Sequence, residues 1–332
     1  MARFLIGLVV VVALLVAGVG AFHLSPRPGA WLVKLLFDHG AARTSQALEK
    51  HVPPDVETLA DLPSSPNWPS LRLDVHRPVT PGARVLPTIV WVHGGGWLSG
   101  RKEDVANYLR VIAARGFVAV AVNYTLAPDA VHPTQLRQVH DTLVHLLGRA
   151  DELGIDAARV VLAGDSAGAQ IAAQLAAALA DPAYAAVLDL PTSLPPTALR
   201  GVGLFCGPYD LRLFDYDGRL GPVLRTAMRA FTGRAGLDDN PAIDQASVLH
   251  HVSARFPPAF ITVGNADPLL RHSQLLDQRL RDLGVPVDAL YFPADRSPAL
   301  GHEYQFNLDD PAGTEALERF LAFVHARTAT PS

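Results

Sequence analysis

The stretch that decides the fold is Val160-Val161-Leu162-Ala163-Gly164-Asp165-Ser166-Ala167-Gly168. Its first four residues are apolar and predict a short buried strand, and an Ala-rich helix is expected to follow at once. The Gly-x-Ser-x-Gly pattern between them fits a nucleophile elbow, a sharp turn that holds its serine in a strained conformation. The hydroxyl of Ser166 is therefore expected at the carboxyl end of a sheet and at a helix N-terminus, where developing negative charge is stabilised.

Apolar runs and helical patterns alternate on both sides of this stretch. Residues 88–92 and 117–122 are continuous apolar runs typical of strands covered on both faces, and residues 71–75 alternate like an edge strand. Further strands are expected at 160–163, 202–205, 260–263 and 287–292, with helices at 103–115, 136–150, 271–283 and 314–326. This alternation predicts an α/β fold, a mainly parallel sheet with helices on both faces.

Composition excludes several classes of protein. The chain has 332 residues, of which 49% are hydrophobic, and a formal charge of −4, so a large buried core is expected and nucleic acid is not an expected partner. The single cysteine, Cys206, excludes an intramolecular disulfide and a cysteine-rich metal site. Because Cys206 lies in an apolar run, we expect a buried core thiol.

The N-terminus carries an apolar segment. Residues 4–22 are uncharged and follow Arg3, and nineteen such residues are close to the roughly 20 that span a bilayer as a helix. Small residues at 19–21 also suit signal-peptide cleavage after Ala21. Either interpretation places the rest of the chain on the extracytoplasmic side, anchored to the membrane through residues 4–22 or secreted. We favour the anchor because the apolar run is long for a signal sequence.

Residues 24–70 are expected to form an N-terminal cap and connector. Residues 31–37 are amphipathic at helical spacing and predict a lid over the site, a contact with the membrane surface, or ordinary packing on the domain. Five prolines between 53 and 69 predict an irregular connector. The catalytic domain is then expected at 71–332, with an insertion at 207–257 over the carboxyl edge of the sheet, where ligands bind in such folds.

A glycine-rich loop follows the strand expected at 88–92. Three consecutive glycines in His93-Gly94-Gly95-Gly96-Trp97 let backbone N–H groups point into a cavity, which is what an oxyanion hole requires. His93 itself is expected to stabilise the loop rather than to act in catalysis.

A serine nucleophile needs a base, and the base needs an orienting acid. Asp267 follows the strand at 260–263 and lies 101 residues after Ser166. His302 precedes the last expected helix, which gives the chain order serine, acid, histidine. Asp295 is a rival acid in a Pro-rich loop.

Other histidines compete with His302 for the role of base. His250 and His251 precede the acid and lie in the expected insertion. No pair of histidines has the spacing of a metal site, so we expect neither a metal nor a cofactor.

Together the motifs resemble the hormone-sensitive-lipase-like esterases of the α/β-hydrolase superfamily. The matching stretches are 93–97, 123–128, 164–168, 267–269 and 301–302, within residues 72–325. The resemblance implies hydrolysis of acyl esters, with Ser166 as nucleophile, His302 as base and Asp267 as its orienter. It also implies an oxyanion hole made of the Gly94, Gly95 and Ala167 amides.

The same resemblance implies a cap built from the N-terminal segment and the insertion, and a bracing role for residues 123–128. The sequence departs from the family at two points. Residues 4–22 add a membrane segment, and Glu303 follows the histidine where a small or aromatic residue is common.

The predicted function is a serine carboxylic-ester hydrolase that acts on a small-molecule ester through an acyl-enzyme. Three alternatives stay open. In the first, the enzyme passes the acyl group to another alcohol; in the second, it cleaves an amide; in the third, the fold is a catalytically silent binding module. The absence of a long apolar cap favours short or medium acyl chains, and the sequence specifies no oligomeric state.

Overall fold

The computed structural model describes residues 24–79, 85–191 and 193–329. Within them the strands are arranged in one sheet of eight in the order β1-β2-β4-β3-β5-β6-β7-β8. The strands are β1 (Val56–Pro63), β2 (Arg72–Pro78), β3 (Leu86–Val92), β4 (Val118–Val122), β5 (Ile155–Asp165), β6 (Gly201–Phe205), β7 (Ala259–Thr262) and β8 (Val287–Leu290). β2 pairs antiparallel with both of its neighbours, β1 and β4, and every other neighbouring pair is parallel, which agrees with the predicted class.

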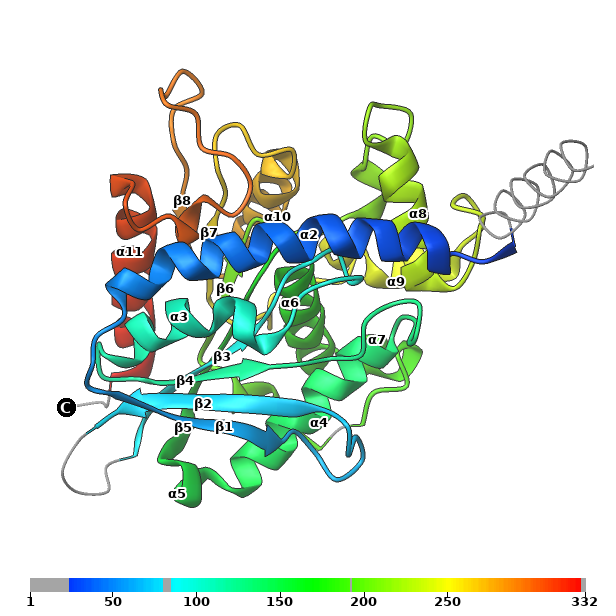
Figure 1. Ribbon diagram of the computed structural model, residues 1–332. Helices are drawn as coiled ribbons and strands as arrows, with labels where there is room; N and C mark the ends of the chain where they lie inside the picture. Colours follow the sequence, from blue (N-terminus) through cyan, green and yellow to red (C-terminus); the bar gives the residue numbers. More distant parts are fainter. Residues whose placement is uncertain (1–23, 80–84, 192, 330–332) are drawn as a thin grey trace, which may run out of the picture.

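Helices connect the strands and cover the sheet (Figure 1). They are α2 (Arg27–Leu48), α3 (Lys102–Ala113), α4 (Thr134–Gly148), α5 (Ala150–Leu153), α6 (Ser166–Ala180), α7 (Pro182–Val187), α8 (Gly221–Thr232), α9 (Pro241–Ala246), α10 (Leu270–Asp282) and α11 (Pro311–Thr328). Short 3₁₀ turns are η1 (Glu49–His51), η2 (Pro196–Ala198), η3 (Leu211–Leu213), η4 (Val248–His250) and η5 (Tyr304–Phe306).

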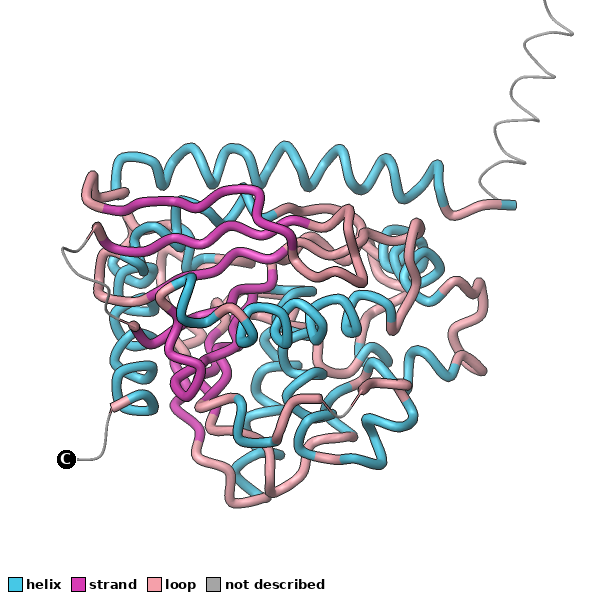
Figure 2. Tube along the Cα trace, turned by 90° about the horizontal axis from the view of Figure 1, so that it is seen from below, coloured by secondary structure: helices cyan, strands magenta, loops and turns pink. Residues whose placement is uncertain are grey.

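Side chains of the central strands point alternately to the two faces of the sheet, and each face has its own core. On β3, Ile89 and Trp91 pack with residues of α3 and α11, whereas Val90 and Val92 pack with residues of α4 and α6. Helices lie on both sides of the strands in Figure 2. Because both faces are covered, the central strands are apolar throughout, which is why their sequence signal is strong.

The predicted irregular connector is wrong over residues 56–63, which form β1. This strand pairs antiparallel with β2 at the edge of the sheet, with an irregularity between Leu59 and Leu62. Most of its side chains are exposed or half-buried, so it lacks an apolar run. Its one proline, Pro63, ends the strand, where a missing N–H is tolerated.

The amphipathic stretch predicted at 31–37 belongs to a longer helix, α2, with 22 residues. The helix begins at Arg27, and Pro28 stands in its first turn, where the missing N–H costs no hydrogen bond. Ala30 and Val33 are buried, whereas Trp31 and Leu35 are exposed.

The segment between β6 and β7, which includes the residues predicted as an insertion (207–257), contains η3, α8, α9 and η4. α8 contacts α2, and both helices lie beside the carboxyl ends of the central strands (Figure 1). Among the described residues, no helix has the length and apolar character needed to cross a membrane. The predicted membrane or signal segment, residues 4–22, lies outside the described residues.

Candidate active site

Ser166 stands at the junction of β5 and α6 with a φ of 50°, a left-handed conformation that is rare for a residue with a side chain. Small residues around it make this turn sterically feasible. A methyl group on Gly164 would lie 2.6 Å from the carbonyl oxygen of Val92, and one on Gly168 would collide with the same carbonyl. The glycines are therefore required because β3, β5 and α6 approach one another closely.

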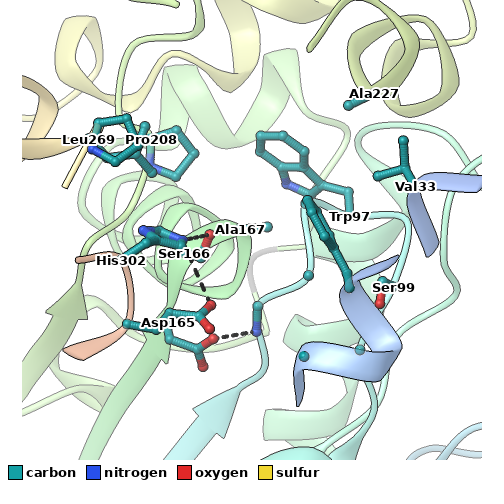
Figure 3. Close-up of a pocket in the computed structure, with 18 of the residues that line it drawn as sticks. Val33, Trp97, Ser99, Asp165, Ser166, Ala167, Pro208, Ala227, Leu269 and His302 are labelled. Carbon is teal, nitrogen blue, oxygen red and sulfur yellow. Dashed lines mark hydrogen bonds and ion pairs between the residues drawn. The ribbon is translucent and has the colours of Figure 1, made fainter. Parts of the chain in front are cut away.

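The structure brings Ser166, His302 and Asp267 together at the carboxyl edge of the sheet. Nε2 of His302 lies 3.0 Å from Oγ of Ser166, and Nδ1 lies 2.8 Å from Oδ2 of Asp267. The other carboxylate oxygen of Asp267 accepts a 2.7 Å hydrogen bond from the Leu269 amide. Figure 3 shows the imidazole and the hydroxyl facing each other. One proton can thus move along a continuous path from the hydroxyl to the imidazole.

The rival residues lie elsewhere. His250 contacts Asp210 at 3.1 Å, and His251 contacts the carbonyl oxygen of Asp244 at 2.9 Å. Asp295 is exposed in the loop after β8. The chain order serine, acid, histidine therefore selected the residues that meet in space.

The surroundings of His302 favour its protonated form. Burial alone lowers the pKa of His302, but the adjoining Cys206, the hydrogen bond to Asp267 and the nearby Glu303 outweigh burial, in that order, and raise the pKa well above its ordinary value. Burial also raises the pKa of the Cys206 thiol, so the thiol is neutral near pH 7 and acts as a hydrogen-bond partner.

Cys206 is buried, as predicted, but it also touches the site. It follows β6 with a φ of 44°, and its sulfur lies within 4.8 Å of ligand atoms of Asp267 and His302. In the described residues this is the one group of three side chains with metal-ligand geometry. Both ring nitrogens of His302 face Asp267 and Ser166, so the arrangement suits proton transfer. In the sequence, the one signal for this contact was the position of Cys206 directly after an expected strand.

The glycine loop requires a correction. The amide of Gly94 donates a 2.8 Å hydrogen bond to Oδ2 of Asp165, so it is not free to bind an oxyanion as predicted. Asp165 also accepts a 2.7 Å hydrogen bond from Nε1 of Trp91. A buried carboxyl group next to Ser166 thus anchors the first glycine. The amides of Gly95 and Gly96 have no acceptor among the described residues.

The loop is braced on its other side. Oη of Tyr124 donates to the carbonyl oxygens of His93 and Gly94 at 3.1 and 3.3 Å. The ring of Tyr124 stacks on that of His93 at 4.4 Å. Burial lowers the pKa of His93 to about 4, so this histidine is neutral. These contacts agree with the bracing and loop-stabilising roles expected for Tyr124 and His93.

A cavity of about 780 Å³ opens onto Ser166. Its walls come from the glycine loop, α2, the insertion and the loop after β7. In Figure 3, Trp97, Val33 and Ala227 lie on one side of Ser166, and Pro208 and Leu269 lie on the other. The cavity is mostly apolar and carries its chemical groups at the floor, which is typical of a small-molecule site.

The fold and site agree with comparisons to known proteins. A family model described as the alpha/beta hydrolase fold matches residues 89–296, so the chain belongs to that family. The resemblance to its hormone-sensitive-lipase-like esterases is confirmed.

Individual relatives give more detail. Carboxylesterase NlhH of Mycobacterium tuberculosis is 28% identical over 272 residues, covering 80% of this chain and 78% of NlhH. Esterase LipQ of the same organism is 27% identical over 256 residues, covering 74% of this chain but only 59% of LipQ. The crystal structure of esterase B from Lactobacillus rhamnosis has a TM-score of 0.78 and 22% identity, covering 91% of this chain and 96% of esterase B, and shows the shared fold. These relatives support the predicted class, a carboxylesterase hydrolase.

Proposed function

We propose that this protein hydrolyses carboxylic esters through a covalent acyl-enzyme on Ser166. The observation that supports this most strongly is the chain of hydrogen bonds from Oγ of Ser166 through His302 to Asp267, on the floor of the apolar cavity. Each member lies within hydrogen-bond reach of the next, the geometry that general-base activation of a serine requires.

In the first step His302 takes the proton of Ser166 while Oγ attacks the ester carbonyl carbon. Asp267 accepts the Nδ1–H bond and so stabilises the imidazolium that forms. The proton then passes from His302 to the departing alcohol as the C–O bond breaks. Water then enters, gives a proton to His302 and attacks the acyl carbon. The bond between that carbon and Oγ breaks, His302 returns the proton to Oγ, and the carboxylic acid leaves, which restores Ser166.

The carbonyl oxygen becomes negatively charged during each attack and needs N–H donors. We assign this role to the amides of Gly95 and Ala167, which line the cavity, with the neighbouring Gly96 amide as a third donor. Ala167 stands in the first turn of α6, where amides lack a partner within the helix. Gly94 is left out because Asp165 holds its amide.

The substrate that fits best is a neutral ester with a short or medium acyl chain. The cavity holds a molecule of modest size, and most of its lining is apolar. Relatives named acetyl esterase in Salmonella, and esterase B solved with a "C6-C4 SN3" inhibitor, agree with this range for those proteins.

The proposal is tested by an activity series over p-nitrophenyl esters of increasing acyl length, together with labelling by a fluorophosphonate probe. We expect turnover that declines for long chains and a single adduct on Ser166, located by mass spectrometry of the digested protein. A chain that hydrolyses none of the esters and takes no label at Ser166 would refute it.

We also propose that the catalytic domain works on the extracytoplasmic side of the membrane. The support is the sequence of residues 4–22 alone, an uncharged apolar segment behind Arg3. Fractionation of cells that express the full chain, followed by mass spectrometry of the N-terminus, separates an anchored form from one cleaved after Ala21. Recovery of the intact chain in the cytoplasmic fraction would contradict the proposal.

A further inference from the structure

Glu303, the residue after His302, adopts a left-handed conformation with a φ of 59°. This conformation is uncommon for a glutamate and turns its side chain back toward the site. Its Oε1 lies 3.8 Å from Nε2 of His302, the nitrogen that faces Ser166. The side chain lines the cavity and is 35% exposed. Glu303 thus approaches the imidazole from a direction different from that of Asp267, which holds Nδ1.

Glu303 also meets a second carboxyl group. A hydrogen bond joins it to Asp165, and a methyl group on Gly94 would lie 3.0 Å from Oε1 of Glu303. Asp165 is 3% exposed and already accepts hydrogen bonds from Trp91 and Gly94. Two carboxyl groups in hydrogen-bond contact cannot both be ionised at low cost, which favours the protonated form of the buried Asp165.

The proton and the charge of this pair are unequally shared. Burial first, and the Glu303 charge second, raise the pKa of Asp165 well above its ordinary range. Asp165 is therefore the member of the pair that holds a proton, and Glu303 is the more exposed partner and the one beside His302. The neutral Asp165 stays in place as the group that anchors Gly94.

We propose that Glu303 is a positioning residue: its carboxylate, fixed by Asp165, stands beside Nε2 of His302, makes the imidazole a stronger base, and ties the histidine loop to the glycine loop. This inference rests on the proposed function, because it concerns the base of that reaction. When His302 accepts the proton of Ser166, Asp267 faces one side of the imidazolium and Glu303 the other. Both carboxylates then stabilise the cation.

Other titratable groups near His302 do not supply the negative charge that the proposal assigns to Glu303. Cys206 after β6 is a neutral thiol, and burial raises the pKa of Tyr108 on α3 and of Tyr124, so both stay protonated. Burial lowers the pKa of His272 on α10 to about 4, which leaves it neutral at pH 7. Asp267 is unchanged in every variant of the experiment on Glu303. Asp104 on α3 lines the cavity but is not among the groups that raise the pKa of His302.

The decisive experiment compares Glu303→Gln with the wild type in the pH dependence of kcat/KM, which reports the free enzyme. Gln keeps the size of the side chain and its ability to hydrogen bond Asp165, but it removes the charge at 3.8 Å. We expect the acid limb to move to lower pH by about one unit, because His302 becomes a weaker base, with less than about tenfold loss at high pH. Glu303→Asp, which keeps the charge, should leave the limb close to the wild-type position.

Glu315→Gln on the exposed side of α11 is the matched control and should leave the profile unchanged. The rate of Ser166 labelling by a fluorophosphonate, measured over the same pH range, reports the same acid limb and requires no ester turnover. Because only folded protein is labelled, the measurement is not affected by a misfolded fraction. Any of three results overturns the inference. The acid limb of Glu303→Gln stays at the wild-type pH, the acid limb of Glu303→Asp moves as far as that of Glu303→Gln, or Glu303→Gln loses all labelling. Failure of the wild type to label at Ser166 refutes the proposed function instead.

Discussion

Nε2 of His302 lies 3.0 Å from Oγ of Ser166, although 136 residues separate them in the chain. Two loops hold the histidine at this distance. The Ala266 amide donates to the Leu300 carbonyl oxygen at 2.9 Å, and the Leu300 amide donates to Oδ1 of Asn265 at 2.8 Å. The loop that carries Asp267 and the loop that carries His302 are thus bonded to each other. Asp267 and His302 are positioned as one unit against Ser166.

Ser166→Ala is expected to lower ester hydrolysis by about 10⁴-fold or more, because the nucleophile is lost. Initial rates on p-nitrophenyl acetate and butyrate measure this. Ser253→Ala, in the loop before β7 and outside the cavity, is the matched control and should keep wild-type activity. Near-normal turnover by Ser166→Ala would eliminate the nucleophile assignment.

Asp267→Asn is expected to reduce kcat by about 10⁴-fold, because the amide no longer stabilises the tautomer and the cation that His302 needs. Asp295→Asn removes the rival carboxylate in the exposed loop and should change kcat less than about twofold. Steady-state kinetics of the two variants under identical conditions compare the two acids directly. The reverse ranking would move the acid of the triad to Asp295.

Gly168→Ala is expected to destabilise the protein by about 1–3 kcal/mol or more, since the new methyl group would collide with the carbonyl oxygen of Val92. Gly148→Ala is the opposite case, because nothing lies within 4 Å of a methyl group at the end of α4. That change should be neutral or stabilise by about 0.5–1 kcal/mol. Urea unfolding followed by circular dichroism measures both, and equal stabilities would show that the elbow is not closely packed.

Acid is expected to destabilise the fold through its buried neutral histidines. Burial lowers the pKa of His76 in β2 to about 4, and its Nε2 has no hydrogen-bond partner in the described part of the chain. The unfolded state then binds a proton before the folded state does. The contribution of neutral His76 to the free energy of unfolding is complete above pH 6.5. It is lost as the pH falls toward 4, with a loss of about 2 kcal/mol by pH 5.

Urea unfolding of wild type and His76→Gln at pH 7.5 and 5.0 measures this contribution. The variant should lose less stability between the two pH values than the wild type, whatever its stability at pH 7.5. His39→Gln, at an exposed position of α2, should leave the difference unchanged. An equal loss in wild type and His76→Gln would rule out the role of His76.

The elements that were predicted best are those whose environment is uniform along their length. β3, β4 and β6 are buried on both faces, so continuous apolar runs marked them. β1 is mostly exposed and leaves no clear pattern in the sequence, and only residues 31–37 of the 22-residue α2 showed helical spacing. Their positions depend on partners distant in the chain, β2 for the strand and α3 and α8 for the helix.

The sequence alone determined which residues meet at the site, because strand order and local turn chemistry fix where Ser166, Asp267 and His302 emerge from the sheet. Only the tertiary structure decided which amides are free. Asp165 takes the Gly94 N–H because β3 and β5 lie side by side, a contact between segments 71 residues apart. It also decided that Glu303 meets Asp165 next to the base. Such pairings arise from the packing of distant loops, and local sequence patterns do not encode them.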